Sequence, residues 1–582
     1  MNVFLDADFW AGKILEEDTH MMVQAGMTTN FIVLYDNTLS NGLAVANGVL
    51  DYCEYDLVRL SMLFGGILPP VPITINCVPG AGGASWGGTT MNLYVTATSD
   101  AAGAPAIVDA ELAEMFMSAQ GNGWIPNWSN GEALSRVLAT VLYPNRIDLF
   151  STANFWINSA RNDWVDNVDH SDQHFDTIGC GALFLYYLAN QLNYKWPDII
   201  AAGAPTTNTL AETATVLGVA NAYTNFFNLL NTYYPDTSLW NLPNDNPYPL
   251  GPQEMSPILY IRHNLADDGT SHTGSLADSP DIIAKNNPVA NPQGTYSTPA
   301  SIASDAESDP NIIDGQTNYV YLRVWNRGQN AHNVFAAVYW SPPATLVTPN
   351  MWNLIGYGYY PDVPAGQLVQ VSNPGITWPA DLLPGPGHNC FVATVGNAFD
   401  LAPTPPTFPT FNDFVNYIYA NNNITWRNFN TVAMKGMHHK RPPFDGFVAL
   451  PFHITGAWDK PHVFNLETLA SLPQGSRFAL QVPHRVGMAF QPGHGDREEY
   501  EDPDCKDDRR RLRIRLSSHG SHDLGKIELP ANTKVHSHLL VDIPVKLHTK
   551  PCEIAIRQLY NGREVGRVTW RLVPYKHIEI SQ

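Results

Sequence analysis

The sequence predicts a multidomain α+β protein, and three observations support this fold class. The chain has 582 residues, which is enough for more than one hydrophobic core. Strand-like and then helix-like segments fill the first part, whereas from Pro257 onward short strand-like segments alternate with Pro, Gly and Asn turns. Charge is also unevenly distributed, which indicates a second boundary near residue 435. We therefore predict three domains, at residues 1–250, 251–434 and 435–582.

The charge distribution also bears on partners and location. Residues 1–430 hold 11 of the 33 Lys and Arg and 37 of the 54 Asp and Glu, a net charge of −26, whereas residues 431–582 have a net charge of +5. An acidic surface repels phosphate groups, which argues against a nucleic-acid partner. No apolar run reaches the roughly 20 residues that a transmembrane helix needs, and the first residues lack the pattern of a signal peptide. We expect a cytoplasmic protein, or one exported without a cleaved signal peptide.

The first part of the chain is predicted to contain strands on either side of one helix. β-branched, aromatic and other apolar residues favour strands at three places: 31–35, 71–78 and 91–97. Between the first two, residues 43–64 carry apolar side chains at helical spacing. The glycine-rich stretch 80–88 joins two strands and does not open a helix, so we interpret it as a loop or hairpin and not as a phosphate-binding loop.

Two helices that carry carboxylates follow. The first, at 107–119, ends at the Gly121-Asn122-Gly123 turn, and its apolar residues at spacings of three and four predict one buried stripe: Val108, Leu112, Met115 and Ala119. The second helix begins near Asn130, a candidate N-cap, and ends at Pro144. Ala110, Glu111 and Glu114 lie together beside the predicted stripe, and Glu132 lies in the first turn of the second helix. We predict that Glu111, Glu114 and Glu132 converge in one pocket.

The pentapeptide Ala110-Glu111-Leu112-Ala113-Glu114, with Glu132 in NGEALSR, resembles the zinc-binding motif of the gluzincin metallopeptidases. In that family H-E-x-x-H supplies two zinc ligands and a general base, and a Glu about twenty residues on supplies the third ligand. The resemblance implies a zincin-like fold for residues 1–250. It makes Glu111 the general base, Glu114 a substituted metal ligand, Glu132 the third ligand and Ala110 no ligand.

Loss of both imidazoles changes the expected cofactor. Two carboxylates alone would hold zinc weakly, and oxygen ligands suit calcium, magnesium or manganese better. A second candidate site precedes the helix predicted at 179–194, where His170, Asp172 and His174 lie in an acidic segment. Two histidines four residues apart could share one metal ion if the segment were helical. The alternative is a solvated acidic loop.

The rest of the chain is predicted to be all-β. Short strands separated by turns recur from 257 to about 430, at intervals typical of β-sandwiches. Stretches such as NYVYLRVWNRG and GHNCFVATV resemble the immunoglobulin-like modules of extracellular and surface proteins. Further strands follow after 445, and Asn561-Gly562 indicates a hairpin. We predict two immunoglobulin-like sandwiches.

Three functions remain open on the sequence alone. The favoured one is a catalytically degenerate metallopeptidase-like protein that acts in binding, structure or self-assembly, with a protein or peptide partner. Sandwich edges can pair between copies, so a homo-oligomer fits this hypothesis. The first alternative is an active metal-dependent peptidase that uses Glu111 as general base. The second is metal-free acid–base chemistry by Glu111 or Glu114. The scarcity of histidine before residue 250, where only His20, His170 and His174 occur, favours the degenerate protein.

Overall fold

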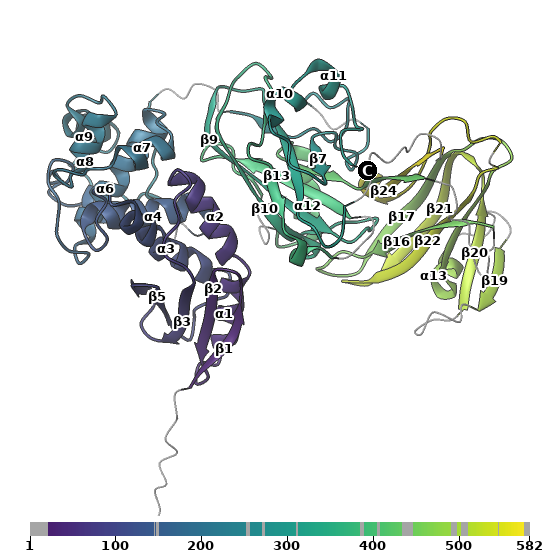
Figure 1. Cartoon of the computed structure of the whole chain (residues 1–582), viewed down its shortest axis with the longest axis horizontal. Coiled ribbons are helices and arrows are strands. Elements are labelled where there is room, and N and C mark those ends of the chain that lie inside the picture. Colours follow the sequence, from purple (N-terminus) through teal and green to yellow (C-terminus); the bar gives the residue numbers. More distant parts are fainter. Residues whose placement is uncertain are drawn as a thin grey trace, which may run out of the picture. The chain divides into compact units, whose positions relative to one another are not determined.

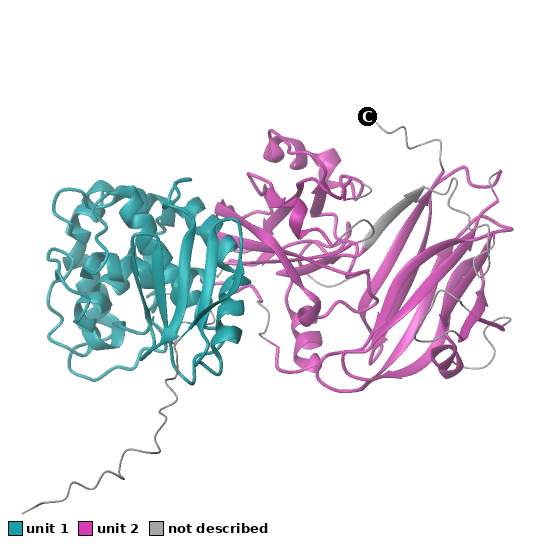
Figure 2. Cartoon of the chain, turned by 60° about the horizontal axis from the view of Figure 1, so that its bottom comes forward, with its two compact units in different colours: residues 1–253 teal, residues 254–582 magenta. Residues whose placement is uncertain are grey.

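A computed structural model describes residues 21–574, apart from 145, 147–149, 252–256, 271–273, 310–311, 385–388, 404–407, 434–445, 491–496, 502–509 and 545. The chain forms two compact units, Met1–Gln253 (unit 1) and Glu254–Gln582 (unit 2) (Figures 1 and 2). Unit 1 combines a sheet with helices and unit 2 consists mainly of sheets, so the α+β prediction is confirmed. The predicted boundary near 435 lies outside the described residues.

Unit 1 contains a five-stranded sheet with the order β1-β2-β3-β5-β4. Its strands are β1 (Met22–Met27), β2 (Phe31–Asp36), β3 (Ile73–Pro79), β4 (Ala84–Gly87) and β5 (Thr90–Val95). The three inner strands are parallel, and the two outer strands run antiparallel to their neighbours. Alternate residues such as Ile73, Ile75 and Cys77 are fully buried, as expected for a sheet covered by helices on one face. The predicted strands are therefore confirmed, and β4 lies in the stretch interpreted as a loop or hairpin.

Nine α-helices of unit 1 fall in the described ranges. They are α1 (Gly42–Leu50), α2 (Cys53–Leu63), α3 (Ala104–Gln120), α4 (Ser129–Leu142), α5 (Ala153–Ile157), α6 (Phe175–Tyr186), α7 (Trp196–Ala202), α8 (Leu210–Val216) and α9 (Ala222–Tyr233). The prediction of one helix over 43–64 is wrong, because the chain breaks at Asp51 and Tyr52. The break lets α1 pack on β2 and β3 while α2 packs on α3, so tertiary packing overrides the helical periodicity.

Helix α3 is the central element of unit 1. It packs against α1, α2, α4 and two strands, and for this reason it is buried on most sides. Val108, Leu112 and Met115 are buried as predicted, but Ala119 is exposed because it lies in the last turn. Gly121 ends the helix in the left-handed conformation, with φ 63°, which a glycine adopts without steric cost.

Unit 2 contains two β-sandwiches. In the first, the sheet β10-β9-β13-β14 packs on β11-β8-β12, and β6 and β7 also pair with β8. Its strands are β6 (Leu259–Tyr260), β7 (Ile282–Lys285), β8 (Asn318–Asn326), β9 (Ala331–Ser341), β10 (Asn353–Val363), β11 (Gln370–Val371), β12 (Ile376–Trp378), β13 (Cys390–Gly396) and β14 (Ile424–Arg427). Short helices α10 (Pro292–Tyr296) and α11 (Pro299–Ile302) lie in one connection. One apolar cluster, which includes Leu322 and Val324 of β8 and Val338 of β9, fills the space between the sheets.

The second sandwich packs the sheet β15-β24-β23-β17-β21 on β16-β22-β18-β20-β19. Its elements are β15 (Phe429–Ala433), β16 (Val448–Thr455), β17 (His462–Ser471), β18 (Arg477–Pro483), α13 (His484–Ala489), β19 (Arg497–Glu501), β20 (Arg510–Leu516), β21 (His519–Leu529), β22 (Lys534–Asp542), β23 (Cys552–Tyr560) and β24 (Arg563–Val573). Asn561 and Gly562 have φ 51° and 78° between β23 and β24, which confirms the predicted hairpin.

A second apolar cluster is shared by the two sandwiches. Helix α12 (Phe411–Ala420) places Phe411 and Phe414 in the same cluster as Phe464 of the second sandwich and Val392 of the first. Residues 254–582 thus form one compact unit. Helix α12 was not predicted, although Thr410 and Asp413 form a capping box that marks its start.

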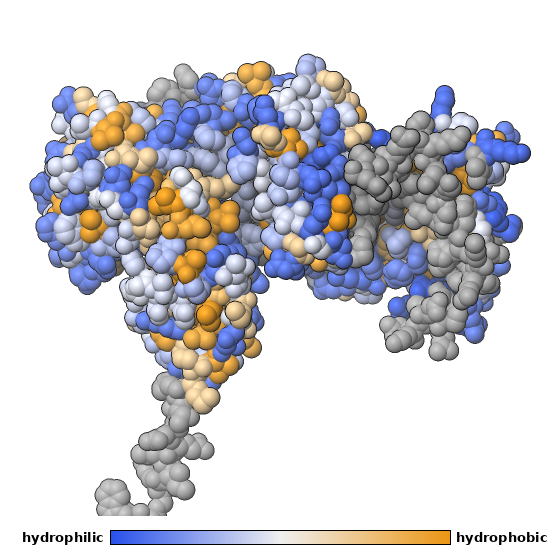
Figure 3. Space-filling model, in the orientation of Figure 1, coloured by the Kyte–Doolittle hydropathy of each residue, from blue (hydrophilic) through white to orange (hydrophobic). Residues whose placement is uncertain are grey.

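Three further observations concern the surface and the chain as a whole. Figure 3 shows hydrophobic residues gathered on unit 1 around α1 and α2, where Leu43 and Val58 are exposed. Among the described residues, no helix has the length and apolar character that a membrane crossing requires. The cysteines of the described part are all free and buried, namely Cys53, Cys77, Cys180, Cys390 and Cys552.

Candidate functional site

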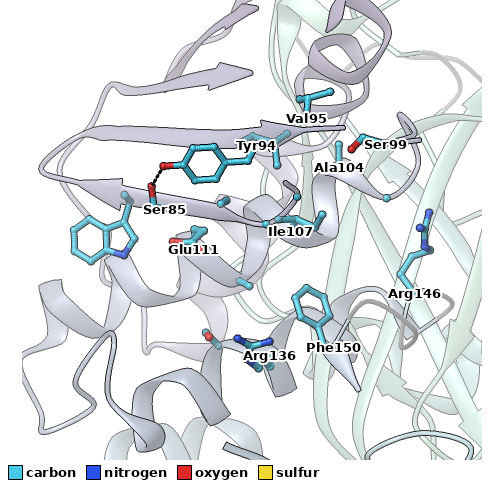
Figure 4. Close-up of a pocket in the computed structure, with 18 of the residues that line it drawn as sticks. Ser85, Tyr94, Val95, Ser99, Ala104, Ile107, Glu111, Arg136, Arg146 and Phe150 are labelled. Atoms are coloured by element: carbon cyan, nitrogen blue, oxygen red, sulfur yellow. Dashed lines mark hydrogen bonds between the residues drawn. The ribbon is translucent and has the colours of Figure 1, made fainter. Parts of the chain in front are cut away.

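A cavity of about 490 Å³ in unit 1 lies between β4, β5, α3 and α4. The three predicted carboxylates, Glu111, Glu114 and Glu132, all line it, together with Asp172 and Arg136. Figure 4 shows Glu111 between Ser85 of β4 and Arg136 of α4. The predicted convergence of the three glutamates is therefore observed, and the cavity is rich in carboxyl groups.

Glu114 is held by partners on two other elements. The indole Nε1 of Trp86, on β4, donates a hydrogen bond of 3.0 Å to Oε2 of Glu114. The Glu114 carboxyl group also shares the cavity with the carboxyl groups of Glu111 and Glu132. Burial, followed by the charges of Glu132 and Glu111, raises the pKa of Glu114 to about 9. Glu114 therefore holds a proton at neutral pH.

Glu111 lies one helical turn before Glu114 and is partly buried. Burial, and then the charge of Glu132, raises its pKa to about 7, and Arg136 opposes this shift. A carboxyl group with a pKa near neutrality can accept or release a proton under physiological conditions.

Glu132 reaches the cavity because the start of α4 is fixed on both sides. Gly131 packs against the backbone of Ile125, where a Cβ atom would approach the Ile125 oxygen to 2.2 Å, so only glycine fits. Asn130 is not the N-cap that was predicted, because the helix begins at Ser129 and the Asn130 amide instead donates to the Gly123 oxygen at 2.8 Å. Arg136 Nη2 donates to Glu132 Oε2 at 3.3 Å.

The second predicted site is divided by the structure. The segment before α6 is not helical, so His170 and His174 do not face one ion as a helical pair would. His170 stacks on Trp128, with ring centroids 4.0 Å apart, whereas His174 Nδ1 lies 2.6 Å from Asp169 Oδ2. Asp172 instead lines the carboxylate cavity. The acidic segment before α6 therefore contributes one residue, Asp172, to the carboxylate cavity.

The residues of the cavity do not fit a zinc ion. Ala110 has no donor atom, and it packs in a small apolar cluster with Ala106 and Ala139. Oε2 of Glu114 already accepts a hydrogen bond from Trp86, and this carboxyl group is protonated at neutral pH. Across the described ranges, no group of three or more His, Cys, Asp or Glu side chains is arranged to hold a metal ion. A catalytic zinc usually has three protein ligands.

Helix α3 carries a further buried carboxyl group, Asp109, which the sequence did not single out. Asp109 is fully buried, and within the described part of the chain neither of its carboxyl oxygens has a hydrogen-bond partner. Burial, and then the charge of Asp56, raises the pKa of Asp109 well above its usual range. Asp56 itself accepts hydrogen bonds from Arg59 and from the hydroxyl of Tyr143. Helix α3 therefore carries protonated carboxyl groups on two of its faces.

Several residues of the site were missed from the sequence. Trp86 and Ser85 lie in the stretch interpreted as a loop or hairpin, where they form strand β4. The hydroxyl groups of Ser85 and Tyr94 lie 3.0 Å apart on the cavity wall (Figure 4). The signal that was available is the Trp in a glycine-rich stretch, because an indole usually needs an acceptor for its N–H group.

Comparison with known proteins gives little further information. No family model matches the chain, and no curated protein matches its sequence. Among solved structures, the CupB6 tip adhesin from Pseudomonas aeruginosa is 8% identical with a TM-score of 0.13, covering 55% of this chain and 99% of that chain. The collagen adhesin (CNA) from S. aureus is 11% identical with a TM-score of 0.13, covering 45% and 88%.

A third structure, AvmM, which catalyses macrocyclization in alchivemycin A biosynthesis, is 10% identical with a TM-score of 0.11, covering 22% of this chain and 80% of that chain. TM-scores this low carry no argument about function. The function must therefore be argued from the cavity itself.

Proposed function

We propose that unit 1 is a catalytically degenerate, metallopeptidase-like domain that binds polypeptide in the carboxylate cavity. The observation that carries this proposal is the hydrogen bond from the Trp86 indole to Glu114, one of the groups that the family resemblance makes metal ligands. A protonated carboxyl group that accepts an indole hydrogen bond is not an open anionic ligand. The missing donor at Ala110 supports the same conclusion.

The cavity wall supports a polypeptide as the occupant. Strand β4 is an outer strand of its sheet and, among the described strands, pairs only with β5, and Ala84, Ser85 and Trp86 line the cavity. An outer strand offers backbone N–H and C=O groups with which an extended segment can pair. The neighbouring side chains would then meet the carboxylates. A small apolar ligand is less suited to a cavity with this much charge.

Ancestry from a zincin-like peptidase is part of the proposal. The order of elements supports it: a helical segment, a mixed sheet, the helix with Glu111 and Glu114, and then the helix with Glu132. We also propose that the two sandwiches of unit 2 are immunoglobulin-like modules that serve attachment or self-association. Their number and their shared core are compatible with a rigid structural role.

The second candidate function is hydrolysis with Glu111 as general base. The pKa of about 7 for Glu111 favours it, because a general base works best when its pKa lies near the working pH.

One experiment separates the two functions. Metal content and hydrolysis of a mixed peptide library are measured for the purified chain and for Glu111→Gln. The binding function predicts no stoichiometric zinc and no cleavage by either protein. Cleavage that Glu111→Gln abolishes would instead establish the hydrolase and refute the degenerate domain.

A further inference from the structure

An exposed aromatic pair lies beside the carboxylate cavity. Phe155 on α5 and Phe175 on α6 are 54% and 45% exposed, and their ring centroids are 5.3 Å apart. We call these two residues the aromatic shelf. Exposed aromatic residues that cluster, in contrast to scattered ones, indicate a contact surface.

Arg136 connects the aromatic shelf to the cavity. Its guanidinium lies over the Phe175 ring, 5.8 Å from the centroid, and it also lines the cavity and bonds to Glu132. A ligand that rests on the shelf can therefore extend one side chain past Arg136 toward the glutamates. Arg136 is thus in contact both with the shelf and with the cavity.

The charge of this surface specifies its occupant. Besides the protonated Glu114, the acidic residues Asp100, Glu111, Glu132 and Asp172 line the cavity. They outnumber the two cations there, Arg136 and Arg146, which pair with Glu132 and Asp100. Residues 1–253 as a whole contain 6 basic and 24 acidic residues, a net charge of −18. Such a field attracts cationic ligands and repels anionic ones.

We infer that the aromatic shelf and the cavity together bind a cationic polypeptide segment in which an apolar side chain is adjacent to a lysine or arginine. The apolar side chain packs on Phe155 and Phe175, and the basic side chain enters the cavity. This inference rests on the proposed binding function and adds the chemistry of the ligand.

The test uses fluorescence anisotropy with the full chain and four labelled peptides of Gly and Ser that differ in a central pair. The pairs are Phe-Arg, Phe-citrulline, Ala-Arg and Phe-Glu. We expect Phe-Arg to bind at least about tenfold more tightly than Phe-citrulline, which keeps the shape of arginine without its charge. Equal affinity for these two peptides would overturn the inference, as would binding of none of them.

Two variants then test whether the aromatic shelf, separately from the cavity, selects the apolar side chain of the peptide. Phe175→Ala should remove the preference for Phe-Arg over Ala-Arg and retain the preference for arginine over citrulline. Val216→Ala, at another exposed apolar position of unit 1, is the matched control and should bind like the original chain. A Phe175→Ala protein that melts at the original temperature and still prefers Phe-Arg would refute the role of the shelf. Peptide cleavage, in contrast, would refute the proposed function and not the ligand preference.

Discussion

The indole of Trp86 donates a hydrogen bond of 3.0 Å to Glu114, a carboxyl group that shares its cavity with Glu132. Trp86 belongs to the outer strand β4, and Glu114 to the central helix α3. This contact fixes one side of the cavity and leaves Glu114 buried and protonated. Stability should therefore depend on the protonation of Glu114.

Glu114→Gln should make the protein more stable at alkaline pH. The folded-state pKa of Glu114 is raised to about 9, so the folded protein binds a proton that the unfolded chain releases above its own lower pKa. The stability from this group is complete below the unfolded pKa and is lost as pH rises toward 9. Glutamine keeps an oxygen that can accept the hydrogen bond of Trp86, and it does not titrate. At about pH 8.5 the melting temperature should rise by about 2–4 °C, with little change at about pH 5.

A matched control is Glu212→Gln in the same unit. Hydrogen bonds from the Thr206 and Thr207 backbone and from the Thr207 hydroxyl lower the pKa of Glu212, which is the opposite shift. Its contribution to stability is present above the unfolded pKa and is lost as pH falls. This variant should therefore lose stability at neutral pH. A lower melting temperature for Glu114→Gln at about pH 8.5 would contradict the assignment of the proton to Glu114.

Asp109→Asn should flatten the pH dependence of unit 1. The pKa of Asp109 is raised in the folded protein. Its contribution to folding stability is therefore complete below the unfolded pKa of about 4 and is lost as pH rises. Because neither oxygen has a hydrogen-bond partner among the described residues, a neutral amide removes no bond seen there. Thermal melts between about pH 5 and 8 should show the variant gaining stability relative to the original chain.

Asp56→Asn serves as the contrasting variant for Asp109→Asn. It replaces a carboxyl group that accepts hydrogen bonds from Tyr143 at 2.8 and 2.7 Å and also pairs with the buried Arg59. We expect a loss of about 1–3 kcal/mol in the free energy of unfolding. Equal changes in the free energy of unfolding for Asp109→Asn and Asp56→Asn would contradict the different surroundings assigned to these two carboxyl groups.

The sequence predicted the convergence of Glu111, Glu114 and Glu132 because helical spacing and the short turn between α3 and α4 restrict where these residues can lie. It did not predict the role of Trp86, because the pairing of β4 with β5 depends on contacts that local patterns do not encode. The same reason explains α12, which is stabilised by the core shared between the sandwiches. The break between α1 and α2 was also missed, because both halves have helical periodicity and only their packing partners differ. Three carboxyl groups of the cavity could be predicted, whereas the partners of each group required the fold.

Asp281→Ala should destabilise unit 2 strongly. Asp281 is fully buried, and it accepts hydrogen bonds from Arg262 at 2.7 Å and from the Trp325 indole at 2.8 Å. Removing it leaves buried guanidinium groups without their counter-charge, which costs about 3–5 kcal/mol. Chemical denaturation of the full chain, followed by Trp fluorescence, measures this loss. Asp542→Ala, which breaks a pair with the exposed Arg477, should cost less than about 1 kcal/mol. Comparable losses in the two variants would show that Asp281 does not hold a buried charge network together.

Restoring the imidazoles tests the proposed ancestry directly. Ala110 and Glu114 both line the cavity with Glu132, so Ala110→His combined with Glu114→His recreates H-E-x-x-H on α3. If the scaffold derives from a gluzincin, the double variant should bind zinc in a one-to-one ratio, because two imidazoles and the Glu132 carboxylate then form a three-ligand set. Calorimetric zinc titration measures this, and the same double variant with Glu132→Gln is the control that should bind far more weakly. Zinc binding that does not depend on Glu132, or none in a protein that folds normally, would show that the backbone does not place these positions as a zinc site. Tight binding through Glu132 would mean that loss of two side chains, and not of the fold, ended metal binding in this domain.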